Sequence, residues 1–486
     1  MQYLKIVSVI FASSCLVFLS TINTLSAEEL IPPTLLDFSQ TDATLTPQLT
    51  VNNQPATVGQ QWIASDKINL SAQLKVAQAD IGKEGSVYVV MLWNNSIFLM
   101  KDNKGNWLPW NGDFKQLVAY FTQTLPEQAT PVEIISGLGG LTGQFAVYVG
   151  YQNNQTRNAI YYNASPITFT VQSIQEVMTT SLHGTTRGMS HFYGVDQGGL
   201  EQFTHLPYDD LTCNSCHVDS TACTSCHAVP GDTPDNAKCL DSCHRRQKFE
   251  QQFSPDYHLL AQASGGLEMK CASCHTAKQM HGDGQPYSSL HNNPTKVDCQ
   301  QSGCHTNLAI AGKTMHETHL QNLECAACHV KMTMTCYSCH FADGSGFQPP
   351  ITDWKILVKQ ASTGKITTGN IQTMVSAGNS FLVVAPFFGH TVQKNNELTC
   401  ATCHDSPAVR EYKQQGSMTL ATWNETDKTI KNLTGVIPIP LDWQTALKVD
   451  FVAKDTSGEW TFQKDSIDAT QMLFADPINV KKMPKF

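Results

Sequence analysis

Residues 28–178 alternate apolar and polar side chains with a period of two, which is the pattern of half-buried β-strands. One face of the first such run carries Ile68, Leu70, Ala72, Leu74 and Val76. Further runs cover residues 87–93, 97–100 and 145–151, and turn-forming pairs such as Asn94-Asn95 and Gly139-Gly140 separate them. The stretch is long enough to bury its own core, so the sequence predicts an all-β sandwich.

Three aromatic residues of this stretch, Trp107, Trp110 and Tyr120, have two interpretations. On a surface they would suit a carbohydrate or a protein partner, whereas aromatic side chains of a sandwich usually belong to its interior. We interpret them as core residues, and the domain as an accessory or docking module.

Beyond residue 178 the period-two alternation weakens, and only two later stretches show it clearly enough to predict hairpins. The first predicted hairpin joins residues 371–375 and 381–385 across Gly378-Asn379, and it would return His390 towards the preceding segment. The second joins residues 447–453 and 459–464 across Ser457-Gly458. We therefore predict a mixed α+β, multidomain chain in which loops and short helices make up most of residues 179–405.

The first 27 residues predict an export signal. Lys5 precedes an apolar run from Ile6 to Leu19, and Leu25-Ser26-Ala27 provides a cleavage site, so the mature chain would begin at Glu28. The alternative is a lipoprotein processing site at Cys15, but apolar residues continue beyond it. We expect an exported protein that is periplasmic, attached to the cell surface or extracellular.

Composition excludes two functional classes. The 486 residues hold 41 Asp and Glu against 32 Lys and Arg, a formal net charge of -9, without the basic clusters that bind a nucleic-acid backbone. No stretch after the signal approaches the roughly 20 apolar residues that cross a bilayer. We expect neither a nucleic-acid partner nor a transmembrane segment.

All 17 cysteines except Cys15 form eight pairs, and a histidine directly follows the second member of every pair. Six pairs enclose two residues: Cys213 and Cys216, Cys223 and Cys226, Cys271 and Cys274, Cys325 and Cys328, Cys336 and Cys339, and Cys400 and Cys403. Cys239 and Cys243 enclose three residues, and Cys299 and Cys304 enclose four. The following histidines are His217, His227, His244, His275, His305, His329, His340 and His404.

C-x-x-C-H is the attachment sequence of haem c, in which two thiols bond to the vinyl groups and the adjacent imidazole ligates the iron. Disulfides of an exported chain and zinc sites built from paired cysteines are the alternatives. Neither explains a histidine after every pair, because only 17 of the 486 residues are histidines. We predict eight haem c groups with the motif histidines as proximal iron ligands.

Nine histidines lie outside the motifs and are candidates for the distal iron ligands. They are His183, His191, His205, His258, His281, His291, His316, His319 and His390. Nine suffice for eight irons, and a haem with two histidine ligands has no open coordination position. His316 and His319 would share one helical face and serve two neighbouring haems.

The spacing of the motifs favours electron conduction. Five residues separate His217 from Cys223, and six separate His329 from Cys336. Chain segments of this length span at most about 25 Å, so the haems of each such pair are neighbours. Eight haems within residues 183–404 leave too little chain to wrap each one, and the haems themselves would form the core.

The predicted organisation has four parts. Residues 1–27 form the signal, residues 28–178 the β-sandwich, residues 179–405 the octahaem domain with a hairpin insertion at about 350–390, and residues 406–486 a haem-free extension that packs on the haem domain.

The motifs resemble those of exported multihaem c-type cytochromes of respiratory and extracellular electron transfer, as an octahaem member. The likeness covers residues 180–445 and includes Ser181-Leu182-His183, His281-Gly282-Asp283-Gly284, the segment from Met334 to Phe341, and the segment from Ala385 to His390. It implies an electron carrier of anaerobic or extracellular respiration. Its partners would be redox proteins or extracellular electron acceptors, and self-association is open.

The competing class is enzymatic. Octahaem proteins that act on nitrite, hydroxylamine or tetrathionate keep one iron open to substrate, but this chain lacks the C-x-x-C-K site of one such group. The sequence alone names no catalytic residue. A third alternative is a filament-forming surface cytochrome.

Overall fold

The computed structural model describes residues 28–31, 42–57, 59, 61–155, 160–210, 222–229, 231–293, 297–301, 303–306, 314–335, 351, 353–376, 378–394 and 398–484. The export signal, Cys15, and the motifs from Cys213 to His217 and from Cys336 to His340 lie outside these residues. The chain divides into two compact units, residues 1–180 with 281–285, and residues 181–280 with 286–486. The predicted mixed α+β, multidomain character is confirmed.

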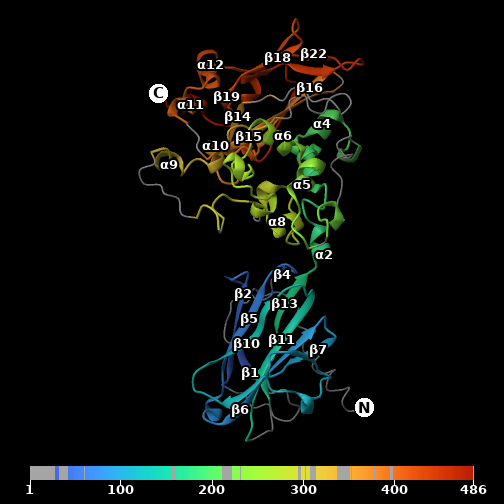
Figure 1. The fold of residues 1–486 in the computed structure, drawn as a ribbon, viewed down its shortest axis with the longest axis vertical. Helices are drawn as coiled ribbons and strands as arrows, with labels where there is room; N and C mark the ends of the chain where they lie inside the picture. The colour runs from blue at the N-terminus through green and yellow to red at the C-terminus, as the bar shows by residue number, and fades with distance from the viewer. Residues whose placement is uncertain are drawn as a thin grey trace. The chain divides into compact units, whose positions relative to one another are not determined.

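The first unit consists mainly of β-strands (Figure 1). They are β1 (Glu28–Ile31), β2 (Thr44–Val51), β3 (Gln54–Pro55), β4 (Gln61–Ile63), β5 (Ile68–Lys75), β6 (Glu84–Trp93), β7 (Ile97–Lys101), β8 (Trp107–Pro109), β9 (Phe121–Thr124), β10 (Thr130–Leu138), β11 (Gly143–Asn153), β12 (Tyr161–Asn163) and β13 (Ile167–Gln172). One set pairs in the order β10-β5-β2 and the other in the order β12-β11-β6-β7-β8, and β1 pairs with β2 and β12 to link the two. Short helices η1 (Gln78–Asp80), η2 (Phe114–Gln116) and α2 (Ile174–Met178) complete the unit.

Side chains from both sets of strands fill one core. The alternation along β5 buries Ile68, Leu70 and Leu74, which share a cluster with Val147 and Val149 of β11. Asn94 and Asn95 take φ values of 51° and 54° in the tight turn from β6 to β7, a conformation that asparagine tolerates well. The period-two pattern therefore located these strands because each one buries a single face.

The aromatic residues of this unit divide into two groups. Trp107 and Tyr120 pack against the core, although both remain partly exposed. Trp110 instead contacts Phe98 and Phe114, with ring centroids 5.8 and 5.4 Å apart. The core interpretation was wrong for Trp110, because the edge strand β8 ends just before it and leaves its ring outside the core.

The helices of residues 181–486 are short, and none of those described exceeds nine residues. They are α3 (Arg187–Tyr193), α4 (Leu200–Thr204), α5 (Asn236–Ser242), α6 (Arg245–Phe253), α7 (Cys271–Cys274), α8 (Ala277–His281), α9 (Thr314–His319), α10 (Cys325–His329), α11 (Cys400–His404), α12 (Pro407–Gln415) and α13 (Trp443–Ala446). Single 3-10 turns are η3 (Val195–Gln197), η4 (Tyr208–Asp210), η6 (Cys223–Ser225), η7 (Gln262–Ser264), η8 (Leu290–Asn292) and η9 (Val480–Lys482).

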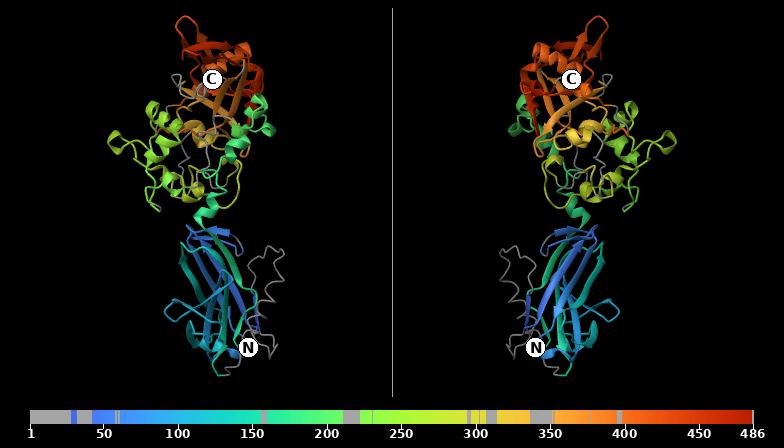
Figure 2. Two further views of the ribbon diagram at one scale, coloured as in Figure 1. Left: turned by 90° about the vertical axis from the view of Figure 1, so that its right-hand side faces the viewer. Right: turned by 90° about the vertical axis from the view of Figure 1, so that its left-hand side faces the viewer.

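The insertion and the C-terminal tail share one sheet in the second unit. Its order is β19-β14-β15-β16-β23, with β24 beside β14. The strands are β14 (Trp354–Gln360), β15 (Ile366–Ser376), β16 (Asn379–Pro386), β19 (Gly435–Pro438), β23 (Ala469–Met472) and β24 (Ala475–Asp476). In both views of Figure 2 the orange and red strands of this unit lie together, with the green and yellow segments beside them.

The two predicted hairpins have different outcomes. β15 and β16 form the first as an antiparallel pair that closes at Ser376 and Asn379, as predicted. The second exists as β21 (Phe451–Lys454) and β22 (Trp460–Lys464), but the prediction that its first strand begins at residue 447 was wrong. β20 (Leu447–Val449) pairs instead in parallel with β17 (Met418–Asn424), which also pairs with β18 (Thr429–Asn432). The chain changes partner at Asp450, whose carboxylate accepts the Trp423 N–H at 2.7 Å.

The segment that carries most of the cysteine motifs has little apolar packing of its own. Among the described residues between 222 and 326, no hydrophobic side chain is buried, whereas Glu250, Asp256 and Gln279 are. The apolar core of this unit lies in the shared sheet and the helix α12 that packs against it.

Candidate cofactor-binding sites

Three of the cysteine motifs form single helical turns. α7, α10 and α11 each begin at the first cysteine of a motif. Residues three apart on a helix share a face, so both thiols of a C-x-x-C motif point to the same side. In the wider motif of α5, Cys239 is helical and Cys243 is the C-cap residue. None of the twelve described motif cysteines belongs to a disulfide bond.

Five motif histidines each face one of the nine histidines outside the motifs. The ring centroids are 6.2 Å apart for His244 and His183, 6.0 Å for His275 and His390, 6.2 Å for His305 and His258, 6.2 Å for His329 and His316, and 6.2 Å for His404 and His319. Every pair thus combines one predicted proximal ligand with one predicted distal ligand. The rings of His316 and His319 face the histidines of two different motifs.

The separation of the rings fits two ligands on opposite sides of one metal ion. A bond of about 2 Å from the metal to each imidazole nitrogen, and about 1 Å more to each ring centre, separates two opposed ring centroids by about 6 Å. The paired histidines therefore fit a metal ion that would be held between the two imidazoles of each pair.

Hydrogen bonds at Nδ1 leave Nε2 of several rings available for a metal. His275 Nδ1 donates to Gln279 Oε1 at 2.7 Å, and His319 Nδ1 donates to the Met315 carbonyl at 3.0 Å. His258 Nδ1 donates to Asp256 Oδ1 at 3.0 Å. Burial lowers the pKa of His390 to about 4, which keeps this ring neutral, as metal ligation requires.

The remaining predicted ligands lie elsewhere. His227 Nδ1 donates to the Asp232 carbonyl at 2.5 Å. The rings of His191 and His291 lie 6.0 and 5.3 Å from the Phe474 ring. His205 lines a cavity of about 370 Å³ near Asp468, and His281 belongs to the first unit. His217 and His340 lie outside the described residues.

Neighbouring motifs follow the order of the chain in space. Hydrogen bonds connect the thiols of two consecutive pairs of motifs, and electrostatic contacts between thiols connect the others. The contacts are Cys226 with Cys239 and Cys243, Cys239 with Cys271, Cys274 with Cys304, Cys299 with Cys325, and Cys328 with Cys403. The described motifs thus form one continuous series from Cys223 to His404.

Two charged residues near the motifs were not predicted from the sequence. Lys355 is buried in β14, where its Nζ donates to the Cys328 carbonyl at 2.8 Å, and burial lowers its pKa to about 8. Glu250 is buried in α6 and accepts the backbone N–H groups of Met334 at 3.2 Å and His390 at 2.8 Å. A lone lysine within the apolar run of residues 354–358 was the one available signal, and Glu250 gave none.

Comparisons with known proteins add no relative. No protein-family model matches the chain, and no curated protein is detectably similar to it. Among the described residues, no helix has the length and apolar character that spanning a membrane requires. Within the same residues, no three His, Cys, Asp or Glu side chains converge into a metal-binding group.

Proposed function

We propose that the protein is an exported multihaem c-type cytochrome that carries electrons through eight covalently bound haem c groups. The observation that carries this proposal is the pairing of motif histidines with histidines outside the motifs at 6.0–6.2 Å. The motifs were defined by the cysteine pairs and the histidine that directly follows each pair, which contain no information about the opposed histidine. If the cysteine pairs formed disulfides, nothing would require a second histidine opposite each motif histidine.

These pairs identify the residues that would hold the haem at each of the five motifs with an opposed histidine. The two cysteines of a motif would hold the porphyrin, the motif histidine would bind the iron on one side, and its opposed histidine on the other. A haem ligated in this way supplies a one-electron iron couple and leaves no coordination position for a substrate. Five such sites favour a carrier over an enzyme.

The order of the motifs supports conduction along the chain. Thiols of motifs that follow one another among those described lie close enough to interact, from Cys226 to Cys403. The scarcity of buried hydrophobic side chains between residues 222 and 326, among those described, also supports the proposal, because the large apolar haem groups of the four motifs within this stretch would supply the missing core.

The test is haem quantification by pyridine haemochrome, followed by low-temperature EPR of the fully oxidised protein. We expect eight haems for each chain and only low-spin ferric signals. A stoichiometric high-spin signal would favour an oxidoreductase with one open iron, and absence of covalently bound haem would refute the proposal.

A further inference from the structure

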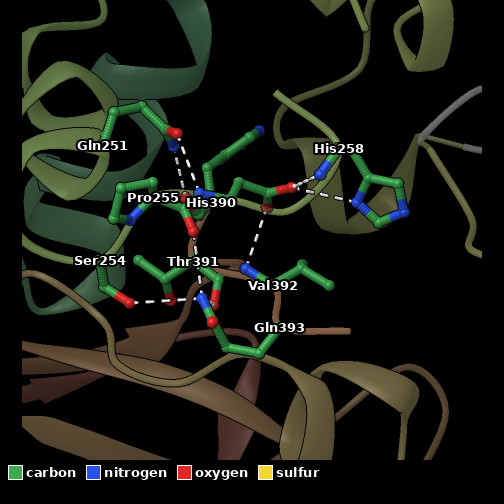
Figure 3. Close-up of polar contacts among 9 residues, drawn as sticks. Gln251, Ser254, Pro255, His258, His390, Thr391, Val392 and Gln393 are labelled. Carbon is green, nitrogen blue, oxygen red and sulfur yellow. Dashed lines mark hydrogen bonds and ion pairs between the residues drawn. The ribbon is translucent and has the colours of Figure 1, made fainter. Parts of the chain in front are cut away.

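The buried carboxylate of Asp256 binds one of the paired histidines, His258, directly; Figure 3 labels His258 but not Asp256. Its Oδ1 accepts two hydrogen bonds from His258, at 2.8 Å from the backbone N–H and at 3.0 Å from Nδ1. Its Oδ2 accepts the backbone N–H of Val392 at 3.0 Å. Asp256 is only 4% exposed. Three N–H donors around one side chain favour its ionised form.

The segment from Gln251 to His258, which is the end of α6 and the loop that follows it, also fixes the neighbouring histidine pair. Gln251 accepts the Asp256 N–H at 3.0 Å and donates to the His390 carbonyl at 2.5 Å. The Tyr257 N–H donates to the Val392 carbonyl at 2.8 Å. The loop therefore connects the pair of His258 and His305 to the pair of His275 and His390.

The acceptor at His258 differs in charge from those at two other paired histidines. His275 donates to the neutral amide of Gln279, and His319 donates to a neutral backbone carbonyl. A carboxylate that binds the outer N–H of a ligating histidine fixes the ring and raises its basicity. A more basic ligand, with a buried negative charge beside it, stabilises ferric iron relative to ferrous iron.

We propose that Asp256 is a positioning residue that orients His258 towards the iron of His305 and makes this haem harder to reduce than the haems of His275 and His404. The inference rests on the proposed function and deepens it. The haem of His305 would then be a step of low reduction potential within the series of motifs, between those of His275 and His329.

The first experiment compares the redox titrations of the wild type and Asp256→Asn, followed by haem absorbance. Asparagine keeps an acceptor oxygen but removes the charge. We expect one haem to become easier to reduce, with an equilibrium constant for its reduction about tenfold larger. For a one-electron couple this equals a rise of about 59 mV in its reduction potential. Glu425→Gln removes an exposed charge that pairs with Lys428 outside every motif, and should leave every potential in place. A fully loaded Asp256→Asn protein with unchanged potentials would overturn the inference.

A second experiment does not depend on the folding of Asp256→Asn. The ring planes of His258 and His305 are 73° apart, whereas those of His275 and His390 are 26° apart. Near-perpendicular imidazoles give a more anisotropic low-spin EPR signal than near-parallel ones. We expect the anisotropic signal, assigned by its loss in His258→Met, to persist to lower potentials than the signal lost in His390→Met. The reverse order would overturn the inference.

Haem content separates the two possible failures. A wild-type protein without covalently bound haem refutes the proposed function itself. A fully loaded protein in which the His305 haem is not the harder to reduce refutes only the role of Asp256.

Discussion

The imidazole of His390 depends on contacts far away in the sequence. Its ring faces His275, its N–H binds Glu250, and its carbonyl binds Gln251. Among the described residues, its Nδ1 is buried without a hydrogen-bond partner.

Replacement of His390 by alanine should therefore remove one axial ligand without removing a haem. We expect a new high-spin ferric EPR signal equal to one haem, while the haem content stays unchanged. Gln393→Ala is the matched control, since Gln393 lies on the same segment, is not a candidate ligand, and donates hydrogen bonds to Ser254, Pro255 and Thr391. An unchanged low-spin spectrum of His390→Ala would contradict the assignment of this ligand.

At the residue scale the sequence predicted cysteine and histidine as the residue types that would bind haem. It did not predict which histidine faces which motif histidine. Each motif histidine follows its cysteines directly, so local spacing identifies it. A distal histidine has no local pattern, because its position depends on how the whole segment folds. Asp256 stands two residues before His258, and that spacing alone gave no reason to select it.

Helix α6 fixes two segments that arrive from later in the chain. The carboxylate of Glu250 accepts N–H groups from Met334 and His390, and Arg246 donates to the Met334 carbonyl and lies over the Phe387 ring. Burial raises the pKa of Glu250, and Arg246 opposes this effect.

Glu250→Ala should leave two buried N–H groups without an acceptor. Each unsatisfied group costs about 1–3 kcal/mol, so we expect the unfolding free energy of the second unit to fall by about 2–6 kcal/mol. Glu250→Gln retains an acceptor oxygen and should cost less. Calorimetric unfolding of both variants gives the comparison, and equal losses would contradict this role of the carboxylate.

Elements with local signals were predicted, and those that pair distant segments were not. The hairpin of β15 and β16 follows from two apolar runs around a turn. The parallel pairs β14 with β19 and β16 with β23 join the insertion to the tail, and no local pattern specifies them. The same limit explains the error at residues 447–449, which pair with β17 rather than within the hairpin.

The first unit has a core of its own at the scale of the whole molecule. The cluster of buried residues runs from Ala43 to Val171 and includes none from the second unit. The alternation of residues 28–178 predicted this unit because a two-layered β domain buries one face of each strand.

Residues 28–180 alone should therefore fold without haem. We expect a β-rich circular dichroism spectrum and a cooperative thermal transition, with no Soret absorbance after expression alongside the haem-attachment apparatus. Lack of a cooperative transition would show that this unit requires the rest of the chain.

The most direct test of the account is the intact mass of the protein matured in a host that attaches haem c. The account predicts the mass of the processed chain plus eight haem groups, one for each motif. A mass equal to the bare chain, or lower by two hydrogens for each disulfide, would contradict it.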